Sequence, residues 1–501
     1  MVTLPLWAVV GLGAFAVLAI LDRILVPSLR WALERRAYAA IDELNTRLRL
    51  KIQPFKLAKR RALIDSLLFD PEVLAAIEAH AKEMGVPRDV SMQKAKTYAR
   101  EIVPTFSAYA YFSIGTRAAR WLSQALYRVR LGYLNDAALK AVDPDAAVVF
   151  VINHRSNMDY VLVTYVASSS SALSYAVGEW AQVWGLKSLI SSMGAYFIRR
   201  DSRDPLYRRI LARYVHMATS AGVTQAVFPE GGLTRDGALR PPKLGLLSYM
   251  VSGFDPKAAR DVVFIPVGVN YDRVLEDRIQ IGALAVEANP DVAARGPRFR
   301  FNPLVLAGFL AKNAWLAVRG RWYRYGYACV SFGAPVSLRD YLWRKGLDLR
   351  SLPPEARTRE IERLGHMLMS EVGHVVPVLP VPMVARVMLE AGDHALTPFE
   401  LKGRVFEIIE QLEARGVYIH IPRADRDYAI DVGLRMLVMR KIVLTDAETG
   451  AGRASNVSDT LADGTSYRAN PDEKLLLAYY ANSIAQHFAF APSDAHQHPA
   501  R

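Results

Sequence analysis

One short stretch decides the fold class of this chain: Ala146-Ala-Val-Val-Phe-Val-Ile152, which runs directly into Asn153-His-Arg-Ser-Asn-Met-Asp-Tyr160. A continuous apolar, β-branched run that stops at polar residues is typical of a strand buried inside a sheet. The polar segment then forms the turn at the carboxyl end of that strand. We therefore expect a buried strand that delivers a histidine and an aspartate to one edge of a sheet.

Similar runs recur further along the chain, with helix-compatible stretches between them. They are Ala195-Tyr-Phe-Ile198, Thr224-Gln-Ala-Val-Phe228, Val262-Val-Phe-Ile-Pro-Val267 and residues 327–332. Short buried strands that alternate with helices indicate an α/β fold. We expect a central, mostly parallel, mixed sheet flanked by helices over residues 136–372, with the functional side chains at the strand ends.

The rest of the chain is predicted to be mainly helical. Apolar residues at three- and four-residue spacing indicate a helical region over residues 37–135. Three prolines in His374-Val-Val-Pro-Val-Leu-Pro-Val-Pro382 interrupt helix formation. We place a boundary there and expect a mostly helical C-terminal unit over residues 373–490. The small and polar residues 491–501 are predicted to form a disordered tail.

Residues 1–36 are predicted to form an N-terminal membrane anchor with a basic flank. No charged residue occurs from Val2 to Leu21, and about 20 apolar residues suffice for a helix to cross a bilayer. No basic residue precedes this stretch, which argues against a cleaved signal peptide. Basic residues crowd its far side, so the positive-inside rule predicts a membrane-associated protein with its catalytic part on the cytoplasmic face, of the inner membrane in a bacterium. A buried N-terminal helix is the alternative, because Pro5, Gly11 and Gly13 weaken the apolar signal.

Composition limits the remaining function classes. Of the 501 residues, 51% are hydrophobic and 22% are charged, which excludes a wholly disordered chain. The net charge of +14 suits anionic lipids, anionic substrates or nucleic acid. Residues 109–131 mix aromatic side chains with arginines, as a helix at a lipid headgroup interface does, and packing against a protein core is equally compatible. Cys329 is the single cysteine, which excludes an intramolecular disulfide, and its apolar neighbours predict a buried structural thiol.

The first strand supplies the candidate catalytic pair, His154 and Asp159. On a regular helix two residues five positions apart lie about 140° apart, so they cooperate only if a turn separates them. A strand-to-helix turn allows the Asp159 carboxylate to reach one ring nitrogen while the other nitrogen faces a substrate. His154 is then a candidate general base for an alcohol, with Asp159 fixing its tautomer. A turn histidine capped by an aspartate is the structural alternative.

Cations follow the next two strands and are candidates for binding a phosphate group. Arg199 and Arg200 end the second strand, and Arg235 and Lys243 follow the third. The planar guanidinium pairs with phosphate oxygens at two points, although paired arginines are more often surface charge. We predict that these four side chains bind an acceptor phosphate.

Three further positions are expected to shape the same site. Gly231 and Gly232 permit close approach of the backbone to a ligand. Glu230 is predicted either to hold the turn or to bind an acceptor hydroxyl. Pro266, in the fourth strand, is predicted to shape a pocket wall or to mark an edge or bulge.

The four segments resemble, in this order, the sequence blocks of the glycerol-phosphate acyltransferase superfamily. The blocks are residues 154–160, Gly194-Ala-Tyr-Phe-Ile-Arg-Arg200, Phe228-Pro-Glu-Gly-Gly232 and Ile265-Pro-Val267. The residues of the first two blocks are most similar to the glycerol-3-phosphate and dihydroxyacetone-phosphate acyltransferase branch, and residues 477–488 are similar to the end of its long members. Two departures occur: Leu233 stands where relatives commonly have arginine, and Asp272 where several have glutamate. Both departures concern the acceptor more than the reaction.

The resemblance implies an enzyme that transfers an acyl group from acyl-CoA or acyl-carrier protein to the sn-1 hydroxyl of glycerol 3-phosphate, giving lysophosphatidate for phospholipid synthesis. It implies His154 as the base, Asp159 as its partner, and phosphate binding by the arginines. No cofactor and no metal are expected, because a thioester is already activated. Dihydroxyacetone phosphate or lysophosphatidate are alternative acceptors. A non-catalytic basic scaffold at a membrane surface is an alternative of another class, and no motif predicts nucleic-acid binding.

Overall fold

The computed structural model describes residues 52–108, 110–167, 172–177, 190–199, 202–258, 260–288, 325–445 and 465–489. The predicted anchor and basic flank at 1–36, Arg200 and the predicted tail at 491–501 lie outside these residues. Within the described ranges, we find no helix with the length and apolar character that crossing a bilayer requires.

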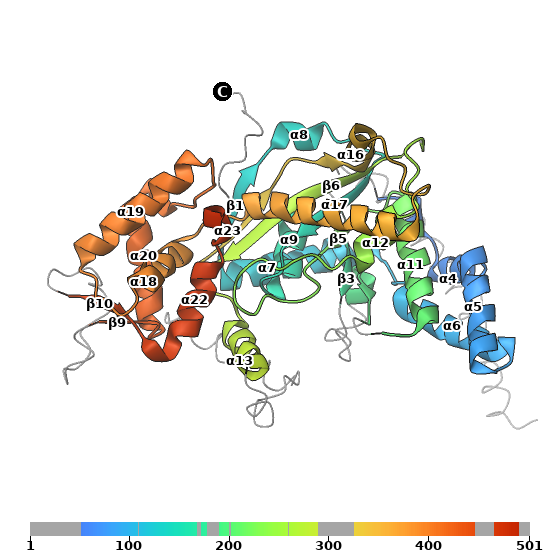
Figure 1. Ribbon diagram of the computed structural model, residues 1–501, viewed down its shortest axis with the longest axis horizontal. Coiled ribbons are helices and arrows are strands. Elements are labelled where there is room, and N and C mark those ends of the chain that lie inside the picture. Colours follow the sequence, from blue (N-terminus) through green and yellow to red (C-terminus); the bar gives the residue numbers. More distant parts are fainter. Residues whose placement is uncertain are drawn as a thin grey trace, which may run out of the picture.

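One mixed sheet forms the centre of the described structure (Figure 1). Its strands are β1 (Arg128–Leu134), β2 (Ala147–Ile152), β3 (Ser174–Val177), β4 (Tyr196–Phe197), β5 (Gln225–Val227), β6 (Val262–Tyr271), β7 (Tyr327–Phe332) and β8 (Val336–Ser337). They are ordered β1-β7-β6-β2-β5-β3-β4, and β8 also pairs with β6. Only the pairs β6–β7 and β6–β8 are antiparallel among these strands. The predicted α/β fold with a mostly parallel mixed sheet is confirmed.

Strand β2 lies inside the sheet, between β5 and β6, and its register explains its sequence. Ala147 to Ile152 pair in parallel with Val262 to Val267. Successive side chains of a strand point to opposite faces. Val148, Phe150 and Ile152 accordingly belong to one hydrophobic cluster, and Ala147, Val149 and Val151 to another. Both faces are covered, which is why the run is continuously apolar rather than alternating.

Helices cover both faces of this sheet. One cluster contains residues of α4 (Arg60–Leu68), α5 (Pro71–Met84), α6 (Arg88–Ile102), α11 (Pro205–Ser220), α12 (Gly245–Val251), α16 (Leu338–Lys345) and α17 (Pro354–Val375). The other cluster contains residues of α7 (Thr116–Leu126), α9 (Met158–Ala167) and the C-terminal helices. The remaining short elements before β6 are α3 (Pro54–Leu57), the π-helix η2 (Ala110–Gly115) and α8 (Asp136–Lys140), and α13 (Asp277–Ala288) follows β6.

Local signals in the sequence fix the ends of several helices. Asp204 caps α11 by accepting the backbone N–H groups of Leu206 and Tyr207, and Pro205 occupies the first helical position. Thr397 and Glu400 form a capping box at the start of α19 (Pro398–Ala414). These caps satisfy N–H groups that have no partner within the helix.

The helical region predicted over residues 37–135 ends earlier than expected. Helix α7 stops at Leu126, and residues 128–134 form strand β1, which pairs in parallel with β7. Strand β1 lies at the edge of the sheet with exposed residues on both faces, so its sequence Arg-Val-Arg-Leu-Gly-Tyr-Leu lacks the continuous apolar run of an inner strand. Strand β7 and its buried Cys329 lie as predicted, and burial raises the pKa of the Cys329 thiol to about 12.

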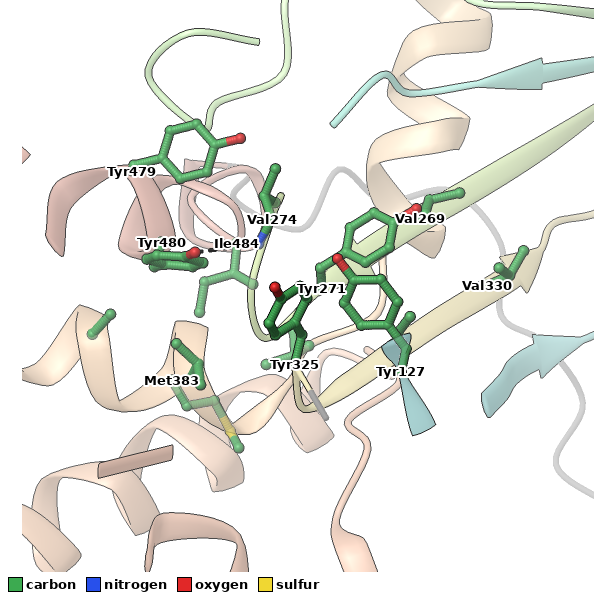
Figure 2. Packing of buried hydrophobic residues seen from close by; sticks show 14 of the residues in the cluster. Tyr127, Val269, Tyr271, Val274, Tyr325, Val330, Met383, Tyr479, Tyr480 and Ile484 are labelled. Carbon is green, nitrogen blue, oxygen red and sulfur yellow. Dashed lines mark hydrogen bonds between the residues drawn. The ribbon is translucent and has the colours of Figure 1, made fainter. Parts of the chain in front are cut away.

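The C-terminal helices pack directly against the end of β6. They are α18 (Pro380–Ala391), α19, α20 (Arg426–Met439), α22 (Lys474–Asn482) and α23 (Gln486–Ala489), with a two-stranded sheet of β9 (Val443–Thr445) and β10 (Tyr467–Ala469). Figure 2 shows Tyr271, the last residue of β6, and Val274, which follows the strand, near Met383, Tyr480 and Ile484. These side chains belong to one buried cluster, so the hydrophobic core continues across the boundary predicted at residues 373–382. That domain boundary itself stays a prediction.

Candidate active site

The carboxyl end of β2 brings His154 and Asp159 together. His154 lies in the turn and Asp159 in the first turn of α9, with 2.9 Å between Nδ1 of the imidazole and Oδ2 of the carboxylate. The same Oδ2 accepts the backbone N–H groups of Arg155 at 2.7 Å and Ser156 at 3.0 Å. Oδ1 accepts the hydroxyl of Tyr271 at 2.7 Å. Four donors and the positive end of α9 therefore stabilise Asp159 as a buried carboxylate.

This arrangement determines which nitrogen of His154 is available. A carboxylate accepts a hydrogen bond from Nδ1–H, which leaves the lone pair on Nε2. Nε2 is buried and has no hydrogen-bond partner within the described part of the chain. His154 lines a cavity, where its ring lies 4.3 Å from the ring of Phe228 and 5.4 Å from that of Tyr160. His154 is therefore placed to act as a base, with Nε2 as the nitrogen that can accept a proton.

Two carboxylates, the buried Glu230 and the partly buried Glu276, hold the turn around His154. Oε1 of Glu230 accepts the backbone N–H of His154 at 2.8 Å, and Oε2 accepts that of Arg240 at 3.2 Å. Burial raises the pKa of Glu230 to about 7. Glu276 accepts the hydroxyl of Ser156 at 2.7 Å and the side-chain amide of Asn157 at 3.1 Å, and burial raises its pKa. Of the two roles predicted for Glu230, the hydrogen bonds match the turn-holding one.

Cations line the same cavity, which has a volume of about 600 Å³. Among the predicted residues, Arg199, Lys243, Gly231 and Gly232 form part of its wall. Gly231 has a φ of +67°, and a Cβ there would lie 2.5 Å from Cδ of Lys243. Glycine thus gives the Lys243 side chain room, while the Lys243 backbone N–H donates to the carbonyl of Pro229 at 2.7 Å.

Arg199 is already engaged by a carboxylate. Its Nε and Nη2 donate to Glu101 at 2.9 and 2.6 Å, and this pairing raises the pKa of Arg199. A bidentate ion pair leaves less of the guanidinium for a ligand. Arg203 and Arg208, which the sequence did not single out, also line the cavity. The cavity therefore holds cations other than those predicted.

Three other predicted positions lie away from this cavity wall. Arg235 and Pro266 are not among the lining residues, and Pro266 sits within β6 opposite Val151. Asp272 is buried and accepts the backbone N–H groups of Tyr327 and Val381 at 2.8 and 3.0 Å. Burial raises the pKa of Asp272 to about 7. It joins β7 to the start of α18 and does not line the cavity.

A second cavity of about 370 Å³ lies on the other side of α9 and is mainly apolar. Its wall comes from η2, α7, α9 and β3, and includes Tyr111, Leu122, Val161, Tyr175, Met193 and Leu275. Tyr160 lines both cavities. The sequence did not predict this cavity, because its lining residues have the apolar spacing of an ordinary core.

Comparisons with known proteins show what this chain is similar to. A family model described as acyltransferase matches residues 135–270, which include β2 to most of β6. A second model, the glycerol-3-phosphate acyltransferase C-terminal region, matches residues 314–491, from before β7 to the end of α23. The chain is thus similar to acyltransferases over much of the sheet and to glycerol-3-phosphate acyltransferases over its C-terminal part.

Individual members of the glycerol-3-phosphate acyltransferase family align with most of this chain. The glycerol-3-phosphate acyltransferase of Aeromonas hydrophila is 26% identical over 446 residues, covering 87% of this chain and 51% of its own. That of Pseudomonas savastanoi pv. phaseolicola is 25% identical, covering 86% and 49%. The chain thus spans about half the length of these curated relatives. Among solved structures, the 1-acyl-sn-glycerophosphate acyltransferase of Thermotoga maritima is 19% identical, with a TM-score of 0.27 over 52% of this chain and 77% of its own.

Proposed function

We propose that this protein transfers an acyl group from a thioester to the sn-1 hydroxyl of glycerol 3-phosphate, forming lysophosphatidate. One observation carries the proposal: the buried Nε2 of His154 has no partner in the described part of the chain, and His154 lines a cavity whose wall also contains cations. The similarity to glycerol-3-phosphate acyltransferases supports this chemistry.

His154 acts as the general base in this mechanism. Nε2 takes the proton of the acceptor hydroxyl as its oxygen attacks the thioester carbonyl, and Asp159 stabilises the resulting imidazolium. The carbon–sulfur bond then breaks, and the departing thiolate recovers the proton from Nε2. The products are an ester and a thiol, and His154 returns to its starting form. The reaction needs no redox step.

The cationic cavity holds the acceptor phosphate in this proposal. Lys243, Arg203 and Arg208 line it together with His154, so a phosphate bound there places a hydroxyl of the same small molecule near the base. Arg199 also lines this cavity, and its guanidinium is paired with Glu101. Charge-assisted hydrogen bonds to phosphate are the strong class, which favours an anionic acceptor.

The apolar cavity holds the acyl chain of the donor. Tyr160 lines both cavities, so a thioester carbonyl beside His154 has an apolar space behind it for the alkyl chain. The donor thiol is carried by coenzyme A or by acyl-carrier protein.

We also propose that the protein works at the cytoplasmic face of a membrane. Helix α7 buries Ala119, Ser123 and Leu126 and exposes Trp121 on its other side, with Arg117 and Arg120 beside it. An exposed tryptophan next to arginines suits the boundary between lipid headgroups and acyl chains. Trp121→Ala should lower binding of the full chain to vesicles of anionic lipid in a sedimentation assay. Trp343→Ala, which removes another exposed tryptophan on α16, is the control, and equal binding by all three proteins would count against this surface.

The decisive test of the reaction replaces His154 with Ala. Loss of a general base should lower kcat by about 100- to 10,000-fold, measured as thiol release from an acyl-CoA in the presence of glycerol 3-phosphate. His366→Ala, at an exposed position on α17, controls for removing a histidine. Full activity of His154→Ala would refute the mechanism. Parallel assays with dihydroxyacetone phosphate and lysophosphatidate decide the acceptor, which Leu233 leaves open.

A further inference from the structure

Arg155 lies between the two proposed catalytic residues, but its side chain serves neither cavity. The residue is 1% exposed and lines neither cavity wall. Its Nη2 donates to the backbone carbonyl of Ser483 at 2.9 Å, immediately after α22 in the C-terminal helices. A fully buried guanidinium is costly unless it is compensated, so this side chain requires an explanation.

Acidic groups surround the Arg155 guanidinium on the catalytic side. The titratable groups whose charges act on it or respond to it are Asp159 on α9, Glu230 and Asp236 after β5, Tyr479 on α22 and His487 on α23. Burial lowers the pKa of Arg155, and Glu230 is the strongest of the neighbours that oppose this shift. The guanidinium is thus a buried cation near Asp159 and Glu230, both of which contact the His154 turn.

The end of α22 is itself fixed against the loop that follows the third predicted block. The side-chain amide of Asn482 donates to the carbonyl of Asp236 at 2.9 Å. Gly237 has a φ of +85°, and a Cβ there would come within 1.8 Å of the Tyr479 carbonyl oxygen. Figure 2 shows Tyr479 and Tyr480 on this helix, with Tyr480 next to Val274. Helix α22 therefore packs tightly enough against this loop to fix the position of the loop, rather than merely covering it.

Each residue of the turn has an anchor on a different element. Asn153 exchanges two hydrogen bonds with Val269 of β6, at 2.9 and 2.7 Å. The His154 carbonyl accepts the Thr234 N–H at 3.0 Å, and Ser156 is held by Glu276. Arg155 supplies the anchor on the C-terminal helices.

We propose that Arg155 is a positioning residue that fixes the catalytic turn to the end of α22, so that the C-terminal helices hold His154 in line for acyl transfer. This inference rests on the proposed function. It assigns a role to the C-terminal helices in the reaction itself, through contact with the turn rather than with substrate.

Two substitutions in the full chain separate the geometric contribution of Arg155 from its charge. Arg155→Gln removes both the planar guanidinium and its charge. His154 is then no longer held in place, so kcat should fall on the order of 100-fold, while the KM for glycerol 3-phosphate stays unchanged. Arg155→Lys keeps the charge but not the planar fork, so kcat should fall less, about tenfold, again with the KM unchanged.

Hydrogen exchange supplies a readout that does not depend on activity. Arg155→Gln should speed amide exchange in residues 474–484, and Asn482→Ala should speed it in residues 153–160. Lys474→Ala, at the exposed start of α22, is the matched control and should change neither. Should Arg155→Gln fail to fold, Asn482→Ala carries the test alone.

Wild-type exchange in residues 153–160 of Asn482→Ala would overturn the inference, whatever the activity. A raised KM with an unchanged kcat in Arg155→Gln would also overturn it, because that result means Arg155 binds substrate. Absence of acyl transfer by the wild-type protein, with the coupled exchange intact, would instead overturn the proposed function.

Discussion

The two cavities that meet at Tyr160 are built from different parts of the fold and from opposite residue types. The larger one is lined by the loops after β4 and β5 and by α11 and α12, and contains Arg203, Arg208 and Lys243. The smaller one is lined by η2, α7, α9 and β3, and its wall is mainly apolar. An anionic acceptor and an alkyl chain need these two environments; the turn before α9 supplies His154 to the polar cavity, and α9 supplies Tyr160 to both.

This difference explains why the polar cavity could be predicted from the sequence and the apolar cavity could not. A cation after a buried strand is unusual for a core and marks a possible site. An alanine, valine or leucine on a helix looks the same whether it faces a neighbour or an empty space. The apolar cavity exists only because η2, α7 and α9 pack around it without filling it.

The largest expected effect comes from removing a cation from the polar cavity. Lys243→Ala should raise the KM for glycerol 3-phosphate by about 10- to 100-fold, because a charge-assisted hydrogen bond contributes roughly 1.5–3 kcal/mol. The preference for acyl-chain length should not change, since the apolar cavity is untouched. Steady-state kinetics with varied acceptor measure both, and Lys257→Ala at an exposed site is the control. An unchanged KM would remove Lys243 from the acceptor site.

A smaller effect is expected from narrowing the apolar cavity. Val161→Phe adds volume where α9 lines this cavity. Since each buried CH₂ group contributes about 0.8 kcal/mol, exclusion of two or three should lower kcat/KM for a long-chain acyl-CoA roughly tenfold or more relative to a shorter one. The KM for the acceptor should stay the same. Val90→Phe on the exposed face of α6 is the control, and an unaltered chain preference would contradict the assignment.

The smallest effect concerns a buried cation beside the apolar cavity. Lys56 is buried, its Nζ donates to the Ala172 carbonyl at 2.8 Å, and it lies 5.6 Å from the ring of Tyr111, which lines that cavity. Burial lowers the pKa of Lys56 from 10.5 to about 7. The unfolded chain therefore binds this proton at pH values where the folded protein has released it, so this lysine makes stability rise with pH from about 7 to about 10.5.

Replacing Lys56 with Met should therefore stabilise the protein most near neutral pH. We expect Tm to rise by about 2 °C at pH 7, with a smaller gain at pH 9, because the lost bond to Ala172 offsets part of the benefit. Thermal unfolding at both pH values measures this, with Lys82→Met at an exposed site as the control. A lower Tm with an unchanged pH dependence would contradict it.

Particular residues show how far prediction from sequence reached. The strands at β2, β4, β5, β6 and β7 were predicted because buried strands have continuous apolar runs. Strand β1 was missed because an exposed edge strand has none. We did not predict four residues near the site from the sequence: Arg203, Arg208, Glu276 and Tyr271. Their distances from His154 depend on how α11, α13 and β6 pack together, and the separate sequence segments do not specify that packing.

The sequence by itself determined the α/β fold and the pairing of His154 with Asp159, since both follow from local order: a buried strand, a polar turn and the start of a helix. Only the tertiary structure decided the rest. It paired Arg199 with Glu101, turned Glu230 to the His154 backbone, left an apolar space behind Tyr160 and brought Ser483 to Arg155, 328 residues away along the chain. These contacts arise from the folding of distant segments onto a common core, and that geometry is fixed by the whole set of packing interactions rather than by any one motif.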